Sequence, residues 1–134
     1  MRLYTPADYQ AIVDFITANG DRHILGIPKK CSRVRVGFIE ERNGKIVGYS
    51  AMSKDSKYSI TVVDHDCRGS GIASLLLNAK IQWAKEHGFK FLQTKVGVSN
   101  HPSIGMLNKF GYQVVRLGTS KTGKPVLTMR LTLI

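Results

Sequence analysis

Residues 62–73 read VVDHDCRGSGIA, in which a β-branched strand end runs into a glycine-containing turn that opens a helix. The turn holds Gly69, Ser70 and Gly71, whose small side chains let a ligand approach the backbone closely. The first amides of a helix have no acceptor within the helix, and the helix dipole adds to their attraction for anions. This stretch therefore predicts a strand, a turn and a helix that bind a diphosphate through main-chain N–H groups.

The same turn differs from two better-known phosphate-binding loops. It lacks the Lys-Ser/Thr pair of a nucleoside-triphosphate P-loop and the first glycine of a dinucleotide-binding fingerprint. A Gly-Ser-Gly turn between a strand and a helix is also compatible with a simple tight connection. The flanking segments therefore have to be considered as well.

The flanking sequence predicts an α/β domain built on a mixed sheet of about six or seven strands, with three to four helices. β-branched or alternating segments indicate the strands, and apolar residues at helical spacing indicate the helices. The expected strands cover residues 2–4, 34–41, 45–52, 58–63, 89–98, 112–117 and 125–133, and the expected helices cover 6–18, 71–87 and 102–109. No internal repeat or linker divides the 134 residues, so we expect one domain, 1–134.

Turn and cap residues support these boundaries. Asn43-Gly44 predicts a two-residue hairpin turn, because both residues tolerate positive φ. Thr5 and Pro6 predict the start of the first helix, and Gly88 predicts a left-handed end of the second. The second helix is expected to bury an apolar face made of Ile72, Leu75, Leu76, Ala79 and Trp83. Residues 21–33 have no clear pattern, because a Gly and a Pro interrupt any long helix.

The net charge of the chain limits the kinds of molecule that it is expected to bind. With 20 Lys and Arg against 9 Asp and Glu, the formal net charge is +11 and the pI is near 10.0. The basic residues are spread along the chain, with the densest group at 29–35, and the aromatic residues are not interleaved with them as in RNA-binding sheets. We therefore expect a solvated basic surface that favours an acidic partner or a phosphate-bearing cofactor. A nucleic-acid partner is kept as the less favoured alternative.

Composition argues against several other classes. The first residues contain no apolar signal-peptide core, and no window is apolar and long enough to span a bilayer. We therefore expect a cytoplasmic protein without membrane contact. Cys31 and Cys67 are too few for a disulfide framework or a zinc ribbon, so we expect reduced thiols and no metal site.

Two blocks of sequence together resemble a known superfamily. RGSGIA at 68–73 looks like the Arg/Gln-x-x-Gly-x-Gly/Ala motif of the GNAT acyl-CoA-dependent N-acetyltransferases. NHPSIGMLNKFGY at 100–112 resembles their later Asn…Lys-x-Gly-Phe helix. The expected order of strands and helices also agrees with the GNAT fold, so the resemblance covers nearly the whole chain.

The resemblance implies a site for acetyl-CoA as cosubstrate. In relatives, loop amides matching Arg68 to Ala73 hold the CoA diphosphate, and the strand end matching Val62 and Val63 binds the pantetheine arm. That strand separates from the strand at 89–98 to open a slot, and the acceptor amine attacks the thioester directly, without an acyl-enzyme. The implied cofactor-binding residues are Val62, Val63, Arg68, Gly69, Ser70, Gly71, Ile72, Ala73 and Asn100.

Two positions differ from the family pattern and leave the catalytic residues unassigned. Many relatives carry a Tyr that donates a proton to the CoA sulfur where this chain has Leu107, and some carry a Glu base where it has Lys95. His65 and His101 flank the expected slot, but we interpret both as solvated loop residues. Tyr112 stands at the usual Phe position of the family and is interpreted as a packing residue.

The leading hypothesis is an N-acetyltransferase that moves an acetyl group from acetyl-CoA to a primary amine of a small molecule or a protein. The alternative is a catalytically weak CoA-binding sensor or interaction module of the same fold, which the missing Tyr and Glu favour. A nucleic-acid-associated protein ranks third. The acceptor, the acyl-chain preference and the oligomeric state stay open, and because dimers are frequent in the superfamily, a homodimer is one of the open alternatives.

Overall fold

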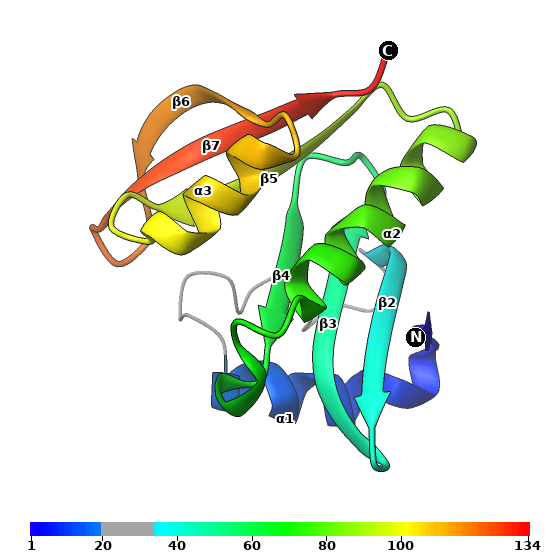
Figure 1. Cartoon of the computed structure of the whole chain (residues 1–134). Coiled ribbons are helices and arrows are strands. Elements are labelled where there is room, and N and C mark those ends of the chain that lie inside the picture. Colours follow the sequence, from blue (N-terminus) through cyan, green and yellow to red (C-terminus); the bar gives the residue numbers. More distant parts are fainter. Residues whose placement is uncertain (20–33) are drawn as a thin grey trace.

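A computed structural model describes residues 1–19 and 34–134 (Figure 1). Three expectations lie wholly or mostly outside the described residues. They are the segment without a clear pattern at 21–33, the basic group at 29–35, and the reduced thiol of Cys31.

Strands and helices follow one another in the expected order (Figure 1). The strands are β1 (Arg2–Leu3), β2 (Val34–Arg42), β3 (Lys45–Ser53), β4 (Ser59–Val63), β5 (Phe91–Gly97), β6 (Gln113–Thr119) and β7 (Pro125–Thr132). The helices are α1 (Tyr9–Asn19), α2 (Ile72–Glu86) and α3 (His101–Lys109), with the 3₁₀ turns η1 (Pro6–Asp8) and η4 (His65–Cys67). The described residues thus confirm the α/β class, and most boundaries lie within two residues of the prediction.

The strands form two antiparallel sheets rather than the single mixed sheet that we expected. One sheet has the order β1-β2-β3-β4 and the other has the order β5-β7-β6. β4 and β5 meet near their starts, where the Gln93 N–H donates to the Ser56 carbonyl at 3.0 Å and the Thr94 hydroxyl donates to the Ser59 carbonyl at 2.9 Å. No strand pairing joins β4 to β5 in the described chain, so each is an edge strand of its own sheet. A strand pattern reports burial and not pairing partners, which is why the sequence did not reveal this division.

Local turn chemistry agrees with the predictions. Asn43 and Gly44 have φ of 54° and 74°, as a primed hairpin turn between β2 and β3 requires. The Asp8 carboxylate accepts a hydrogen bond from the Thr5 N–H at 2.9 Å, which caps the helical start. Gly88 has φ of 75° directly after α2, in the left-handed conformation expected there.

Helices cover both faces of the four-stranded sheet (Figure 1). The buried helical residues are Ile12, Phe15 and Ile16 in α1, and Ile72, Leu76, Leu77, Lys80, Ile81 and Ala84 in α2. Because both faces are covered, β2 is buried without interruption from Val36 to Glu40 instead of alternating between core and solvent.

The predicted apolar face of α2 is wrong at one residue. Leu75 is 44% exposed, whereas Ile72 and Leu76 are buried. Gly48 of β3 allows this close approach, because a Cβ atom there would lie 2.7 Å from Leu76 Cδ1 and 2.8 Å from Ile72 Cγ2. The helix is therefore turned so that Ile72 and Leu76 meet the sheet, which leaves Leu75 toward solvent.

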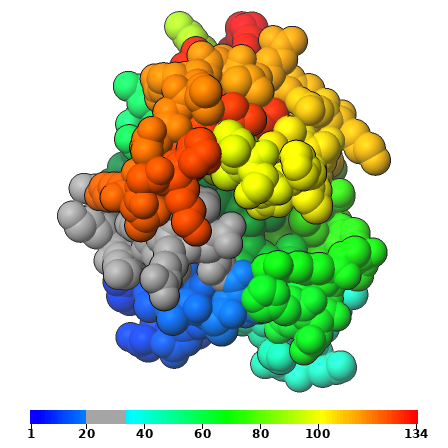
Figure 2. All heavy atoms as spheres, turned by 90° about the vertical axis from the view of Figure 1, so that its left-hand side faces the viewer, coloured from blue at the N-terminus to red at the C-terminus, as the bar shows by residue number. Residues whose placement is uncertain are grey.

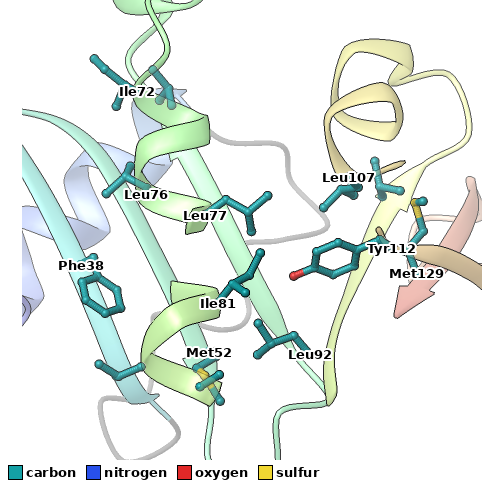
Figure 3. Close-up of a cluster of buried hydrophobic side chains, with 14 of the residues drawn as sticks. Phe38, Met52, Ile72, Leu76, Leu77, Ile81, Leu92, Leu107, Tyr112 and Met129 are labelled. Carbon is teal, nitrogen blue, oxygen red and sulfur yellow. The ribbon is translucent and has the colours of Figure 1, made fainter. Parts of the chain in front are cut away.

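One apolar cluster joins the two sheets (Figure 3). Leu77 and Ile81 reach it from α2, Leu92 from β5, Leu107 from α3 and Met129 from β7. This cluster positions β5 and α3 against α2 although β4 and β5 do not pair.

Candidate active site

A cleft of about 770 Å³ lies where β4 and β5 separate. Its walls are the two edge strands, the loop that opens α2, and α3. Figure 2 shows this face of the molecule hollowed between the yellow atoms of α3 and the green atoms at the start of α2. An edge strand leaves main-chain N–H and C=O groups without a ladder partner, so two such strands present hydrogen-bonding groups to the cleft.

Residues from both sequence blocks that carry the family resemblance line the cleft. Eight of the nine predicted cofactor-binding residues line it, namely Val62, Val63, Arg68, Gly69, Gly71, Ile72, Ala73 and Asn100. Ser70 does not line it, and its hydroxyl donates instead to the Cys67 carbonyl. Ser70 thus stabilises the turn through its side chain.

The loop between β4 and α2 is held by Asp64. Its carboxylate accepts from the Asp66 N–H at 2.8 Å, and its carbonyl accepts from the Cys67 N–H at 2.9 Å. The Lys45 ammonium lies 3.2 Å from the same carboxylate. The Asp66 hydrogen bond first, and Lys45 second, hold the pKa of Asp64 below its usual range. Asp64 is therefore a cap and not a base.

Main-chain N–H groups at the start of α2 are free to bind an anion. In the described residues, no hydrogen bond is present from the N–H of any residue from Gly69 to Ala73, and the first such bond runs from Leu75 N–H to the Gly71 carbonyl at 3.0 Å. Gly69 and Gly71 have φ of 81° and 85°, a left-handed conformation that favours glycine. A Cβ atom at either position would meet nothing within 4 Å, so both open onto free space. These observations fit a diphosphate at the mouth of the cleft.

The Arg68 side chain points away from that anion site. Its guanidinium donates to the Asn19 carbonyl at 2.7 Å and to the Val63 carbonyl at 3.3 Å. Asn19 Oδ1 in turn accepts from the His65 N–H at 3.0 Å. Arg68 therefore ties the end of α1 to the loop, and its contribution to the anion site is limited to its backbone.

Asn100 begins α3 and also lines the cleft. Its side-chain oxygen accepts from the Ser103 N–H at 3.4 Å, which is an N-cap contact. His101 follows it and is exposed at the rim of the cleft. The first sequence block thus brings the start of α2 to the cleft, and the second block brings the start of α3.

A family model described as the acetyltransferase (GNAT) family matches residues 14–112. The chain belongs to the GNAT acetyltransferase family. The match spans the edge strand β4, the loop at residues 68–73 and the helix that follows β5.

Two curated relatives share part of this GNAT chain. An uncharacterised N-acetyltransferase of Methanocaldococcus jannaschii is 34% identical over 86 residues, which cover 57% of this chain and 38% of the relative. A Bacillus subtilis protein, provisionally named a ribosomal protein bS18-alanine N-acetyltransferase, is 29% identical over 79 residues, which cover 57% of this chain and 52% of the relative. The matched region thus spans about half or less of the length of these relatives.

Solved structures share the whole fold. The ribosomal-protein-S18-alanine N-acetyltransferase from Escherichia coli superposes with a TM-score of 0.79 at 17% identity, covering 98% of this chain and 93% of that one. A provisionally named acetyltransferase from Salmonella typhimurium, solved with its cofactor acetyl-CoA, superposes with a TM-score of 0.76 at 20% identity, covering 99% and 92%. Acetyl-CoA is the acyl donor of the GNAT family.

The positions where relatives supply acid and base hold no suitable group in this GNAT chain. Leu107 is buried and lines the cleft. Lys95 is exposed, and its ammonium lies 5.6 Å from the ring centre of Tyr58. His65 is exposed and does not line the main cleft. Leu107 has no proton to donate, and neither Leu107 nor Lys95 is the residue type that relatives carry at its position.

Lys80 is a buried cation that the sequence analysis missed. It is 1% exposed, lines the cleft, and its Nζ donates to the Ser59 hydroxyl at 2.9 Å. Burial lowers the pKa of Lys80 to about 7. The signal was the row Ile72, Leu76, Lys80 and Ala84, in which a lysine interrupts residues spaced by four on one helix face.

Tyr112 packs in the core as predicted, but its hydroxyl is unusual. The residue is 2% exposed and lines the cleft, and its hydroxyl has no hydrogen-bond partner among the described residues. Burial raises the pKa of Tyr112, so the hydroxyl stays protonated at neutral pH. Figure 3 shows the hydroxyl directed toward Leu77 and Ile81 of α2.

Tyr112→Phe is expected to stabilise the protein without ligand. A buried polar group without a partner costs about 1–3 kcal/mol, and Phe removes that group while keeping the ring in place. We expect the free energy of unfolding in urea to rise by about 1 kcal/mol. A decrease would show that the hydroxyl has a hydrogen-bond partner in solution.

The described residues contain no helix that is long and apolar enough to cross a membrane. Among the same residues, no group of three or more His, Cys, Asp or Glu side chains is placed to hold a metal ion.

Proposed function

We propose that this chain is an N-acetyltransferase that moves an acetyl group from acetyl-CoA to a primary amine by direct attack. The observation that carries the proposal is the set of unbonded N–H groups from Gly69 to Ala73 at the mouth of a cleft between two edge strands. A diphosphate fits those donors, and an extended amide-containing arm fits along the edge of β4 that no strand covers, beside Val62 and Val63, where the Val63 carbonyl already accepts from Arg68. We further propose that residues 1–134 work as one domain in the cytoplasm.

The protein's contribution to such a reaction is positioning and charge stabilisation. Acetyl-CoA supplies the activated thioester, and the loop and the β4 edge hold it in one orientation. A main-chain N–H facing the cleft stabilises the charge that develops on the carbonyl oxygen during attack. The amine loses a proton when it forms the amide, and the leaving sulfur ends as a thiol, with solvent in the open cleft accepting and supplying these protons.

The acceptor we propose is a primary amine, which includes the amine of a protein. Two relatives named above carry names that refer to alanine of a ribosomal protein. The formal charge of +11 favours acceptors that are acidic or neutral over polyamines. A useful panel therefore contains peptides that begin with Ala, peptides with internal Lys, free amino acids and spermidine.

The test combines binding and turnover. Acetyl-CoA at a hundredfold excess over its Kd stabilises a protein by about 2.7 kcal/mol, which we expect to raise the Tm by roughly 8 °C. Transfer to the amine panel is then measured by mass spectrometry as addition of an acetyl group. A folded protein whose Tm does not change with millimolar acetyl-CoA would contradict the proposal.

A CoA-binding module without turnover is the second candidate, and Leu107 and Lys95 are the residues that favour it. Neither supplies the proton transfers that relatives assign to those positions. Tight CoA binding with no transfer to any member of the panel would identify this function.

A further inference from the structure

One side of the cleft carries a cluster of polar groups around Lys80. Lys80 lies there with neutral acceptors alone, namely the Ser59 hydroxyl at 2.9 Å, the Ile60 carbonyl at 3.4 Å and the Thr61 hydroxyl at 3.4 Å. None of the ion pairs in residues 1–19 and 34–134 includes it. A buried amine without an anionic partner is costly to charge, so a ligand that brings a negative charge to this position would favour the charged form of Lys80.

The Tyr112 hydroxyl is a second, independent sign of a polar ligand. It is a buried donor with no partner in the described chain, and it lines the same cleft as Lys80. It points toward Leu77 and Ile81 of α2 (Figure 3). Lys80 lies between these two residues in the sequence of the same helix. Lys80 approaches from α2, whereas Tyr112 follows α3 and belongs to the other half of the molecule.

The register of β4 relates this polar region to the anion-binding loop. Val63 lies at the loop end of β4, and Thr61 and Ser59 follow at alternate positions on the face that meets Lys80. Four residues of strand span about 13 Å. A ligand with its diphosphate at the loop and its arm along β4 therefore has its far end, the acyl group, directed toward Ser59 and Lys80. This step rests on the proposed function.

We propose that the cleft accepts acyl-CoA donors whose short acyl group ends in a carboxylate, and that Lys80 and Tyr112 bind that carboxylate. A carboxylate has two acceptor oxygens, one for an ammonium and one for a hydroxyl, and a charge that the neutral β4 groups do not supply. Succinyl-CoA represents this class. In the transfer, the acceptor nitrogen forms a bond to the thioester carbonyl carbon, the carbon–sulfur bond breaks, CoA leaves as the thiol, and the amine gives up one proton. The product is an amide that retains the terminal carboxylate.

Calorimetric binding of three ligands to the full chain tests this proposal. CoA, butyryl-CoA and succinyl-CoA share the nucleotide and the arm, and the last two share a four-carbon acyl chain that differs in the terminal charge. We expect succinyl-CoA to bind at least about tenfold more tightly than butyryl-CoA, since charge-assisted hydrogen bonds at a buried site have this effect or more. Equal or weaker binding of succinyl-CoA overturns the proposal.

Substitutions of Lys80 and Tyr112 test whether these two side chains cause the preference for succinyl-CoA over butyryl-CoA. Lys80→Met is expected to reduce the ratio of butyryl-CoA to succinyl-CoA dissociation constants to about one, and Tyr112→Phe to reduce it severalfold. Lys85→Met, on an exposed position of the same helix, is the matched control and keeps the wild-type ratio. If Lys80→Met does not fold, Tyr112→Phe still tests the proposal. A ratio of the two dissociation constants that stays at the wild-type value in Tyr112→Phe would contradict the proposed contact between Tyr112 and the carboxylate.

The outcomes separate this inference from the proposed function. If CoA and butyryl-CoA bind and succinyl-CoA shows no advantage, Lys80 is only a structural residue bonded to Ser59, and the transferase proposal is unaffected. If none of the three ligands binds the folded protein, both proposals fail together.

Discussion

Gly71→Glu is expected to weaken CoA binding at least about a hundredfold, which is a loss of about 2.7 kcal/mol. Gly71 has φ of 85° and opens onto free space at the cleft, so a side chain there projects into the region of the unbonded amides. Two like charges 4 Å apart repel by about 4 kcal/mol at an effective dielectric constant of 20, and solvent exposure of the loop reduces this value. Calorimetry with CoA on the purified variant measures the loss.

A matched variant separates this effect from backbone strain. Gly123 also has a positive φ, 82°, with nothing within 4 Å of a Cβ atom, and it lies in the turn between β6 and β7, away from the cleft. Gly123→Glu therefore adds the same charge and a similar strain of about 1–2 kcal/mol without approaching the ligand. We expect it to bind CoA with the wild-type affinity. Unchanged affinity in a folded Gly71→Glu variant would refute the assignment of the loop.

Lys80→Met is expected to raise the free energy of unfolding near pH 7 by a few kcal/mol. Burial lowers the pKa of Lys80 from 10.5 to about 7, and the difference corresponds to an upper limit of about 5 kcal/mol for the cost of its charge. The loss of the hydrogen bond to Ser59 offsets about 1 kcal/mol of the gain. Met has a similar length and fills the same space without a charge.

The pH dependence of this gain has a definite sign. Between about pH 7 and 10.5 the unfolded chain holds the Lys80 proton and the folded chain does not, so the wild-type stability rises by about 1.4 kcal/mol per pH unit. Below pH 7 both states are protonated and the full cost remains. The advantage of Lys80→Met is therefore largest at and below neutral pH, and it shrinks as the pH rises.

Urea unfolding at about pH 6, 7.5 and 9 checks this prediction. Lys85→Met is the control, because it removes an exposed lysine from the same helix. A stability difference between Lys80→Met and wild type that does not change with pH would show that Lys80 keeps an ordinary pKa.

Features that depend on short stretches of chain were predictable. The hairpin turn at Asn43-Gly44, the left-handed Gly88 and the glycines of the loop at 68–73 all have the conformations that their residue types favour. The local sequence also sufficed to propose the anion-binding loop, since unbonded amides follow from any strand-turn-helix with small residues at the turn. Two separate blocks of sequence, 68–73 and 100–112, together indicated the GNAT family, and the match to the family model confirms it.

Features that depend on packing between distant segments were not predictable. The exposure of Leu75 follows from the close contact of α2 with Gly48, a residue of another element. The division into two sheets depends on β5 pairing with β7 rather than with β4.

Lys80 and Tyr112 are two site residues whose roles the sequence did not predict. A helical lysine is usually solvated, and a Tyr at a family Phe position usually packs, so the local pattern favoured ordinary roles for both. Their common place in the cleft arises because α2 and the second sheet meet there. Backbone conformation is set by each residue and its neighbours along the chain, and it was therefore visible from the amino acids alone. The burial of an ionisable group depends on which remote surfaces exclude water from it, and that was settled only when the two halves packed together.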